Sequence, residues 1–273
     1  MMQAQQNNTE VNTMNEILKV SNLTKTFCLS RQQQKIEKTK LRKRVAVSGL
    51  SFSLQKGEVF GLLGTNGAGK TTTLRMIATL IKPDKGTIIL DGVDAAKDPE
   101  LIRSKIGFLT SELKLEDFFT PNYMFDYFSK LHNVDPEIAK GRKKVLFQSL
   151  GIDQFAEVKI GQLSTGMKQK ISIAISLVHY PDVIIFDEPT NGLDIITAKT
   201  VTDFLMTLKE AGKTIVISSH IFSLIEKTCD RVGIMVDGQM VLTDSLSNIL
   251  TEASLEDKFF QVYSNIKEDA HHA

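Results

Sequence analysis

The sequence has no long apolar run, only two cysteines and almost no net charge, and each shortage excludes a class of protein. Apolar stretches such as Ile171–Val178 and Val183–Phe186 are far shorter than the roughly 20 residues that a membrane-spanning helix needs. Cys28 and Cys229 have no partner at a metal-binding or redox spacing, which fits a reducing compartment. The 33 Lys and Arg residues balance 32 Asp and Glu residues, so no overall field favours a nucleic-acid partner.

The two ends of the chain differ from the 273-residue whole, which is 42% hydrophobic and large enough for a core with a second lobe. Residues 1–13 are polar and rich in Asn and Gln, without the basic start and apolar centre of a signal peptide. We therefore expect a disordered N-terminus and no secretion. We expect residues 251–273 to form a C-terminal tail that is polar and loose after Tyr263.

Strands and helices alternate along most of the chain. Ile17–Val20 and Leu50–Leu54 have the period-two pattern of a half-buried sheet. Glu58–Leu63 predicts a strand that leads through a glycine-rich loop into a helix over Thr72–Ile81. Later segments predict the strands Ile88–Leu90, Ile106–Leu109, Asp182–Phe186 and Thr214–Ser218, the helix Ala198–Lys209, and a hairpin over Val232–Leu242 that turns at Asp237-Gly238. A helix-rich stretch that follows Thr120-Pro121 interrupts this α/β order.

A basic stretch separates the first two predicted strands. Residues 31–44 hold seven Lys or Arg residues against one Glu and almost no apolar anchor. This composition predicts an extended hairpin loop or a disordered insertion. Its role is open between a solvated loop and a contact with lipid headgroups or an acidic partner surface.

The first candidate site is a phosphate-binding loop between a predicted strand and a predicted helix. Its residues are Gly64, Thr65, Asn66, Gly67, Ala68, Gly69, Lys70 and Thr71, followed by Thr72 in the helix. The glycines allow successive backbone amides to face phosphate oxygens, and the helix N-terminus adds a favourable dipole. We expect Lys70 to reach the β- and γ-phosphates and the Thr71 hydroxyl to bind Mg²⁺.

An acidic pair, Asp187-Glu188, follows the predicted strand Val183–Phe186 at its carboxyl end, where ligands of open α/β sheets collect. Asp187 is suited to hold the Mg²⁺ shell through water, and Glu188 to orient and deprotonate an attacking water. An acidic pair alone is often a solvated strand end. Its place after a phosphate loop in the same chain favours catalysis.

Two further polar residues each have a structural and a functional interpretation. Ser164 is a predicted N-cap for a buried helix continuing over Lys168–Tyr180; it either caps a core helix or helps the helix N-terminus face an anion. His220 follows a predicted strand and is either structural or a group that bonds the γ-phosphate while holding Glu188 and the water in line.

Together these motifs resemble the ATP-binding subunits of ABC transporters. The segment Leu163-Ser164-Thr165-Gly166-Met167 resembles the family's signature motif, and Asn191-Gly192-Leu193-Asp194 and His220 follow in the family's order. The resemblance covers about Glu16–Leu250, and the chain looks most like bacterial subunits of ABC-2 type exporters, including the sodium-export type.

The resemblance implies an α/β fold with a P-loop NTPase core, an antiparallel β subdomain and an inserted helical subdomain. The core would comprise residues 14–112 and 179–250, and the helical subdomain with the signature motif residues 113–178. The implied activity is Mg²⁺-dependent ATP hydrolysis, with Lys70, Glu188 and His220 as catalytic residues and ATP and Mg²⁺ bound in the phosphate loop.

The resemblance also implies partners. A second copy, or a similar ATPase subunit, would clamp two ATP molecules, with Ser164 and Gly166 facing the nucleotide of the opposite subunit and Asp194 at the seam. Phe27 would stack on adenine, although an aromatic residue near a strand end is also ordinary core. ATP-driven closure would power a separate integral membrane transporter subunit, which sets substrate specificity. The chain would then be peripheral, at the cytoplasmic face of the cell membrane.

The sequence departs from the family pattern at three positions. Ser111 stands where the family has a Gln near Mg²⁺ and the attacking water, and Glu112 beside it could substitute through a water. Thr165 and Met167 replace the more frequent Gly and Gln of the signature. We expect hydrolysis to survive at a reduced rate.

The segment Ser111–Lys140 is the expected docking surface for the membrane subunit. It contains the aromatic residues Phe118, Phe119, Tyr123, Phe125, Tyr127 and Phe128, which either anchor an interface or pack inside the helical subdomain. Rival functions are a soluble ABC ATPase of translation or DNA repair, and a nucleotide-binding regulator without turnover. One copy of each motif and no sustained heptads argue against the first, and Glu188 with His220 against the second.

Overall fold

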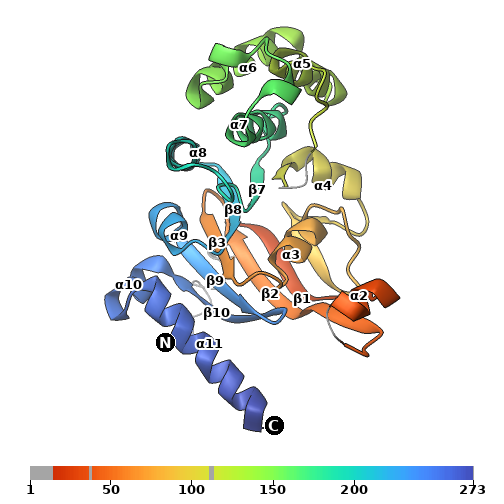
Figure 1. Ribbon diagram of the computed structural model, residues 1–273, viewed down its shortest axis with the longest axis vertical. Helices are drawn as coiled ribbons and strands as arrows, with labels where there is room; N and C mark the ends of the chain where they lie inside the picture. Colours follow the sequence, from red (N-terminus) through yellow and green to blue (C-terminus); the bar gives the residue numbers. More distant parts are fainter. Residues whose placement is uncertain (1–14, 37–38, 111–113, 273) are drawn as a thin grey trace, which may run out of the picture.

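The computed structural model describes residues 15–36, 39–110 and 114–272, arranged as two β-sheets and a separate group of helices (Figure 1). The N-terminus over residues 1–13, expected to be disordered, lies outside the described residues, and so do Ser111 and Glu112. Helices and strands carry the labels of Figure 1.

The central sheet contains the strands that the sequence predicted for the nucleotide-binding core. Within the described residues it has six strands in the order β10-β9-β3-β8-β7-β6. The strands are β3 (Val59–Gly64), β6 (Ile106–Leu109), β7 (Val183–Asp187), β8 (Thr214–Ser219), β9 (Arg231–Val236) and β10 (Gln239–Ser245). All neighbours pair in parallel except β10 with β9. The carboxyl ends of β3, β8 and β7 therefore meet at one edge of the sheet.

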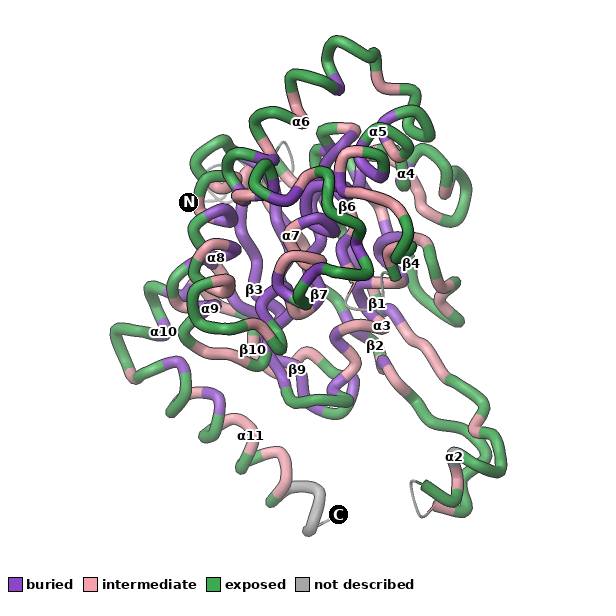
Figure 2. Tube along the Cα trace, turned by 45° about the horizontal axis from the view of Figure 1, so that its top comes forward, coloured by how far each residue is buried: buried purple, intermediate pink, exposed green. Residues whose placement is uncertain are grey.

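A second, antiparallel sheet has the order β2-β1-β4-β5. Its strands are β1 (Glu16–Cys28), β2 (Lys43–Gln55), β4 (Lys85–Leu90) and β5 (Val93–Asp94). Pairing of β1 with β2 continues as far as Cys28 and Lys43, and the short helix α2 (Arg31–Ile36) follows β1. The described part of the basic stretch thus forms the end of a long hairpin, which projects from the body of the molecule (Figure 2).

A cluster of helices lies at one end of the molecule, within the range 113–178 where the sequence predicted a helical subdomain (Figure 1). It consists of α5 (Pro121–Leu131), α6 (Pro136–Leu150), α7 (Thr165–Ser176) and the 3₁₀ turns η1 (Asp153–Phe155) and η2 (Ile160–Gln162). Thr120, Asp135 and Ser164 cap the three α-helices with their side chains, so each helix begins where local chemistry favours it.

Two predicted helix ends are wrong, because both helices stop before the predicted residue. Helix α3 spans Lys70–Ile77 instead of reaching Ile81, and Thr79 just beyond it has a φ of 58°. Helix α7 ends at Ser176, and Tyr180, which was expected inside this helix, has a φ of 57°. The left-handed Thr79 directly follows the C-cap of α3 and terminates that helix, whereas α7 ends four residues before Tyr180. Helix α4 (Pro99–Lys105) precedes β6.

The C-terminal region corrects one expectation and confirms another. The tail after Tyr263 is not loose, because helix α11 spans Leu255–His272. This helix is held by aromatic packing, with the Phe259 ring 5.5 Å from the ring of Phe222. The remaining helices are α8 (Ile195–Glu210), α9 (Phe222–Thr228) and α10 (Leu246–Glu252). The predicted turn between β9 and β10 is confirmed, since Asp237 and Gly238 have φ angles of 47° and 83°, as a type I′ turn requires.

The central sheet separates two hydrophobic cores, as alternation along its strands dictates. In β3, Val59 and Leu63 belong to the core shared with the helical cluster, whereas Phe60 and Leu62 face the antiparallel sheet and α3. Burial on both faces is typical of parallel sheets. None of the helices formed by the described residues combines the length and apolarity needed to cross a bilayer.

Candidate active site

The phosphate loop connects the end of β3 to the start of α3 at the carboxyl edge of the central sheet. Gly69 is the N-cap of α3, with a φ of 101° and no side-chain cap. A Cβ atom at this position would lie 2.4 Å from the backbone oxygen of Ala46 in β2, so only glycine fits. An uncapped helix start leaves backbone amides unsatisfied, which is the arrangement that anions bind.

Lys70 is the buried cation of this loop, with 5% of its side chain exposed. Its Nζ donates a hydrogen bond to the backbone oxygen of Gly64 at 2.7 Å and lies 3.2 Å from Glu188 Oε1. The contact with Glu188 is an ion pair without hydrogen-bond alignment, and no described residue hydrogen-bonds to Oε1. This buried oxygen therefore keeps an acceptor position for a water or hydroxyl.

Asp187 lies at the end of β7, 1% exposed, with two hydroxyl groups around one of its oxygens. Thr71 Oγ1 and Ser218 Oγ each donate to Asp187 Oδ1, at 3.1 Å and 2.5 Å. The loop hydroxyl and the strand-end carboxylate therefore meet across 116 residues of sequence. A hydroxyl and a carboxylate are ligands that a hard divalent cation prefers.

Glu188 has an unusual backbone conformation, with a φ of 52°. A left-handed residue other than glycine costs of order 1 kcal/mol and needs support from its surroundings. Here the support comes from β8, because the backbone N–H of Glu188 donates to both the backbone oxygen and the Oγ of Ser218, at 3.2 and 3.1 Å. His220 Nδ1 lies 2.9 Å from Glu188 Oε2, so the histidine fixes the other carboxylate oxygen.

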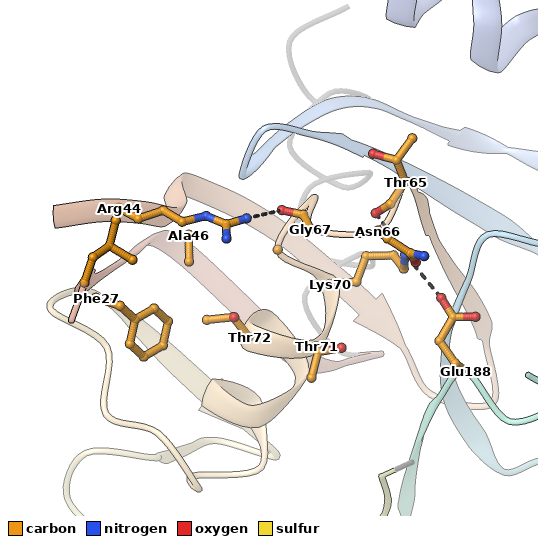
Figure 3. A pocket seen from close by; sticks show the side chains of 12 residues that line it. Phe27, Arg44, Ala46, Thr65, Asn66, Gly67, Lys70, Thr71, Thr72 and Glu188 are labelled. Atoms are coloured by element: carbon orange, nitrogen blue, oxygen red, sulfur yellow. Dashed lines mark hydrogen bonds and ion pairs between the residues drawn. The ribbon is translucent and has the colours of Figure 1, made fainter. Parts of the chain in front are cut away.

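A cleft of about 370 Å³ opens beside these groups. It is lined by Thr65, Asn66, Gly67, Gly69, Lys70, Thr71, Thr72 and Glu188, and by Phe27, Leu29, Arg44 and Ala46 of the β1–β2 hairpin. Figure 3 shows Phe27 and Arg44 on one side of the loop and Glu188 on the other. The structure thus brings Phe27, 37% exposed, to the same cleft as Lys70.

The signature residues lie elsewhere. Ser164 is not among the described residues that line the cleft; it is the exposed N-cap of α7, and its Oγ accepts from the backbone N–H of Met167 at 3.2 Å. Gly166 is buried against α8, where a Cβ atom would lie 2.9 Å from Thr197. Asp194 caps α8 by accepting from the backbone N–H groups of Ile196 and Thr197, and these hydrogen bonds lower the pKa of its carboxyl group.

Comparison with known proteins decides the family. Residues 47–191, which contain the phosphate loop, the signature segment and the acidic pair, match the protein family described as ABC transporter. The chain belongs to this family of ATP-binding proteins. The fold class predicted from the sequence is confirmed, and ATP hydrolysis is the activity of the ABC ATPases.

Individual ABC proteins match over most of the chain. The ABC transporter ATP-binding protein NatA of Bacillus subtilis (strain 168) is 39% identical over 86% of this chain and 94% of its own length. The Nod factor export ATP-binding protein I of Burkholderia lata is 34% identical over 81% of this chain and 72% of its own. A solved dimeric cassette, MJ0796, in a post-hydrolysis state with ADP and Pi, has a TM-score of 0.74 and 25% identity over 84% of this chain and 99% of its own.

Sequence reasoning about the ABC motifs missed two residues of this site. Arg44 was assigned to the basic stretch, but its Nη2 lies 3.4 Å from the backbone oxygen of Gly67 in the phosphate loop. Ser218 was only the end of a predicted strand, yet it contacts both acidic residues. A small hydroxyl residue two positions before a predicted catalytic histidine was the available signal for Ser218. Ser111, predicted near the metal, lies outside the described residues.

Proposed function

We propose that this chain is the ATP-hydrolysing subunit of an ABC exporter, working as one half of a dimer beneath a separate membrane protein at the cytoplasmic face of the membrane. The observation that carries the proposal is that the motifs lie in two separate places on the chain's surface. Lys70 and Glu188 line one cleft and His220 contacts Glu188, while Ser164 lies on the surface and, within the described residues, makes no such contact. A second copy would bring Ser164 to the cleft. The names of relatives, such as Nod factor export, support the exporter class.

In this proposal the described residues perform one hydrolytic step. Water attacks the γ-phosphorus of ATP as its proton passes to Glu188, the bond from phosphorus to the β-bridging oxygen breaks, and ADP and phosphate leave. Glu188 Oε1 is the acceptor for that proton, since Oε2 is held by His220. Lys70 offsets charge on the γ-phosphate, and Phe27 stacks on adenine.

The residues present fit a magnesium ion that is shared with the nucleotide. Thr71 and Asp187 would hold it, and when bound it would neutralise charge on the phosphate oxygens. Among the described residues no group of three acidic, histidine or cysteine side chains could hold a metal alone. Mg²⁺ commonly uses one or two carboxylates together with substrate phosphates, so this sparse set suits it. Ser111 was the third expected ligand.

The dimer is tested with Glu188→Gln, which keeps the shape of the side chain but removes its basicity. ATP should still bind while hydrolysis falls about 100-fold or more, so the closed dimer should accumulate. Light scattering with Mg-ATP should then give a mass near twice 30.4 kDa. A strictly monomeric protein with ATP demonstrably bound would contradict the sandwich arrangement.

Exposed aromatic side chains on and before α5 are the proposed docking surface for the membrane subunit. Phe118, Tyr123 and Tyr127 are exposed, whereas Phe125 is fully buried and belongs to the core. The rings of Tyr123 and Tyr127 are parallel within 10°, with centroids 6.3 Å apart. Aromatic anchors of this kind are favoured in interfaces.

The docking surface is tested by Tyr123→Asp and Tyr127→Asp, with Leu250→Asp on α10 as a control at another exposed apolar position. We expect the two tyrosine variants to keep ATPase activity and lose recovery of the membrane complex, and the control to keep both. Intact complex and transport in both tyrosine variants would exclude this surface. A soluble ATPase of translation or repair is not favoured, since the relatives are named as transporter proteins.

A further inference from the structure

A second cleft lies between the helical cluster and the core, and its lining shares no residue with the nucleotide cleft. It measures about 490 Å³, within the range of roughly 300 to 1,000 Å³ that small-molecule sites occupy. Most of its wall is apolar, formed by Val145 and Leu146 of α6, Leu177 after α7, and Phe204 and Leu208 of α8. We call this cleft the α6–α8 groove.

Two cations stand at the α6–α8 groove around one aromatic ring. Lys213 Nζ lies 3.3 Å from the centroid of the Tyr180 ring and donates to the backbone oxygen of Pro181 at 2.9 Å. The guanidinium of Arg142 lies 5.2 Å from the same centroid and donates to the backbone oxygen of Val178 at 2.8 Å. Both cations are thus fixed in place by neutral partners.

The described lining of the α6–α8 groove supplies no anion that would balance these charges. Its lining contains no Asp or Glu, and within the described residues neither Arg142 nor Lys213 forms an ion pair. The exposed carboxylate of Asp182 lies outside the lining, and its charge raises the pKa of Lys213 without forming an ion pair with it. Burial has the larger effect and lowers that pKa, because the ammonium group is largely removed from water. A bound anion would compensate for the lost hydration.

The two cations of the α6–α8 groove lie together, because both contact the ring of Tyr180. Arg142 lies in the middle of α6, where the part of this helix that lines the groove begins, and Lys213 follows the end of α8, yet both contact Tyr180. The two helices therefore line the groove in opposite directions. Apolar side chains continue away from the cations, along α6 and back along α8 as far as Phe204. A ligand with one anionic end and an unbranched apolar body matches this layout.

We propose that the α6–α8 groove binds a free fatty acid, with the carboxylate at Arg142 and Lys213 and the acyl chain between α6 and α8. The site bridges the helical cluster and α8. The first turn of α8 contains Thr197, which lies beside the signature residue Gly166. The proposal does not depend on nucleotide binding or on a membrane partner.

Binding is measured on the full-length chain with 11-(dansylamino)undecanoic acid, followed by its fluorescence, and with decanoate and 1-decanol as competitors. We expect one saturable site, and decanoate should displace the probe about tenfold more effectively than 1-decanol, because a charge-assisted hydrogen bond is lost with the carboxylate. The Lys70→Ala variant should bind the probe as wild type does, which separates this site from the nucleotide cleft.

A matched pair of variants on α6 locates the site. Val145 is 62% exposed and lines the groove, whereas Ile138 is 52% exposed on the same helix and does not. Val145→Glu should weaken probe binding at least about tenfold, since it places a charged group against the apolar acyl chain, and Ile138→Glu should leave it unchanged. Circular dichroism and ATP binding check that both variants fold.

Three results would overturn the proposal. The first is the absence of saturable probe binding. The second is equal displacement by decanoate and 1-decanol, which would make the groove a purely apolar surface suited to a protein segment. The third is wild-type probe affinity in Val145→Glu, which would place the probe elsewhere.

Discussion

The N-termini of α3 and α7 are the two helix starts that face nucleotide in the proposed dimer, and they are built in opposite ways. Helix α3 begins at Gly69 without a side-chain cap, next to the buried Lys70 and inside a cleft. Helix α7 begins at Ser164, whose hydroxyl already caps the helix and whose side chain is exposed. The start of α3 therefore combines unsatisfied backbone amides with a cation from the same chain. The start of α7 has its own side-chain cap and is an exposed surface.

This difference fits a dimer in which each helix start faces a different nucleotide. An uncapped helix start at a glycine leaves amides that an anion can satisfy, which suits α3 to the proposed nucleotide of its own subunit. The N-terminus of α7 is capped and exposed, so it is stable in a single chain. In the proposed dimer it would face the nucleotide of the other copy. Variants at each end should separate these two roles.

The largest effect is expected at α3. Lys70→Ala removes the buried cation that would offset the charge of the phosphates, so ATP binding should weaken and turnover should fall at least about 100-fold. Fluorescent-nucleotide titration and a phosphate-release assay measure the two effects. Wild-type turnover in purified Lys70→Ala protein would exclude the phosphate loop from the mechanism. It would also remove the contrast between the starts of α3 and α7.

At α7 the expected effect is smaller and requires two copies. Ser164→Ala should cost about 1 kcal/mol of stability through loss of the cap, and about tenfold in turnover through loss of a hydrogen bond to phosphate. Ser245 provides the control, because its Oγ caps α10 by accepting from the backbone N–H of Asn248 at 3.2 Å, the same geometry as at Ser164. Ser245→Ala should lose similar stability in urea unfolding and keep its turnover.

Equal turnover in Ser164→Ala and Ser245→Ala would mean that Ser164 only caps a helix. ATP binding to the monomer should be unchanged in both variants, since neither serine lines the described cleft.

The hairpin side of the cleft should contribute less than either helix end. Phe27→Ala should raise the KM for ATP by about three- to tenfold, the value of one aromatic stack, with little change in kcat. Phe27→Tyr keeps the ring and should keep the KM. An unchanged KM in Phe27→Ala would assign this residue to the hairpin alone.

The smallest predicted effect concerns the helical cluster. The rings of His132 and His179 stack at 4.2 Å, and burial lowers the pKa of His179 to about 4. This value also includes the charges of His132, Arg142 and Lys213, which lower the pKa, and the hydrogen bond to the Ile106 oxygen, which raises it. The unfolded chain binds the proton near pH 6.5 and the folded chain only near pH 4, so stability falls as the pH is lowered between these values.

Because His179 is only partly buried, the loss should be about 1–2 kcal/mol. Urea unfolding of wild type and His179→Phe at pH 7 and pH 4.5 measures it, and the variant should lose less stability on acidification. Parallel losses in both proteins would show that other groups govern acid sensitivity.

Much of the core was predictable because its signals are local. The strand ending at Gly64 and the strand ending at Asp187 are short apolar runs, and their carboxyl ends hold the motifs wherever the sheet is parallel. Helix α11 was missed, since its polar composition suggested a loose tail. Its apolar residues Leu255, Phe259, Tyr263 and Ile266 recur at helical spacing, which was the available signal, and they pack against the core.

The missed parts of the site depend on pairing between distant strands. Ser218 reaches the acidic pair because β7 and β8 pair with Asp187 opposite Ser218. Arg44 reaches the phosphate loop because the β1–β2 register places Phe27 opposite Arg44 at the cleft. Register is a property of the assembled sheet, so composition alone assigned Arg44 to a solvated basic stretch.

The two cysteines give the chain a ready-made position for a reporter dye. Cys28 is exposed and stands between Phe27 and Leu29, both of which line the nucleotide cleft. Cys229 is buried, and burial raises the pKa of its thiol to about 12, so it stays protonated and unreactive toward alkylating dyes. A maleimide fluorophore would attach at Cys28 alone and follow nucleotide arrival in the unmutated protein.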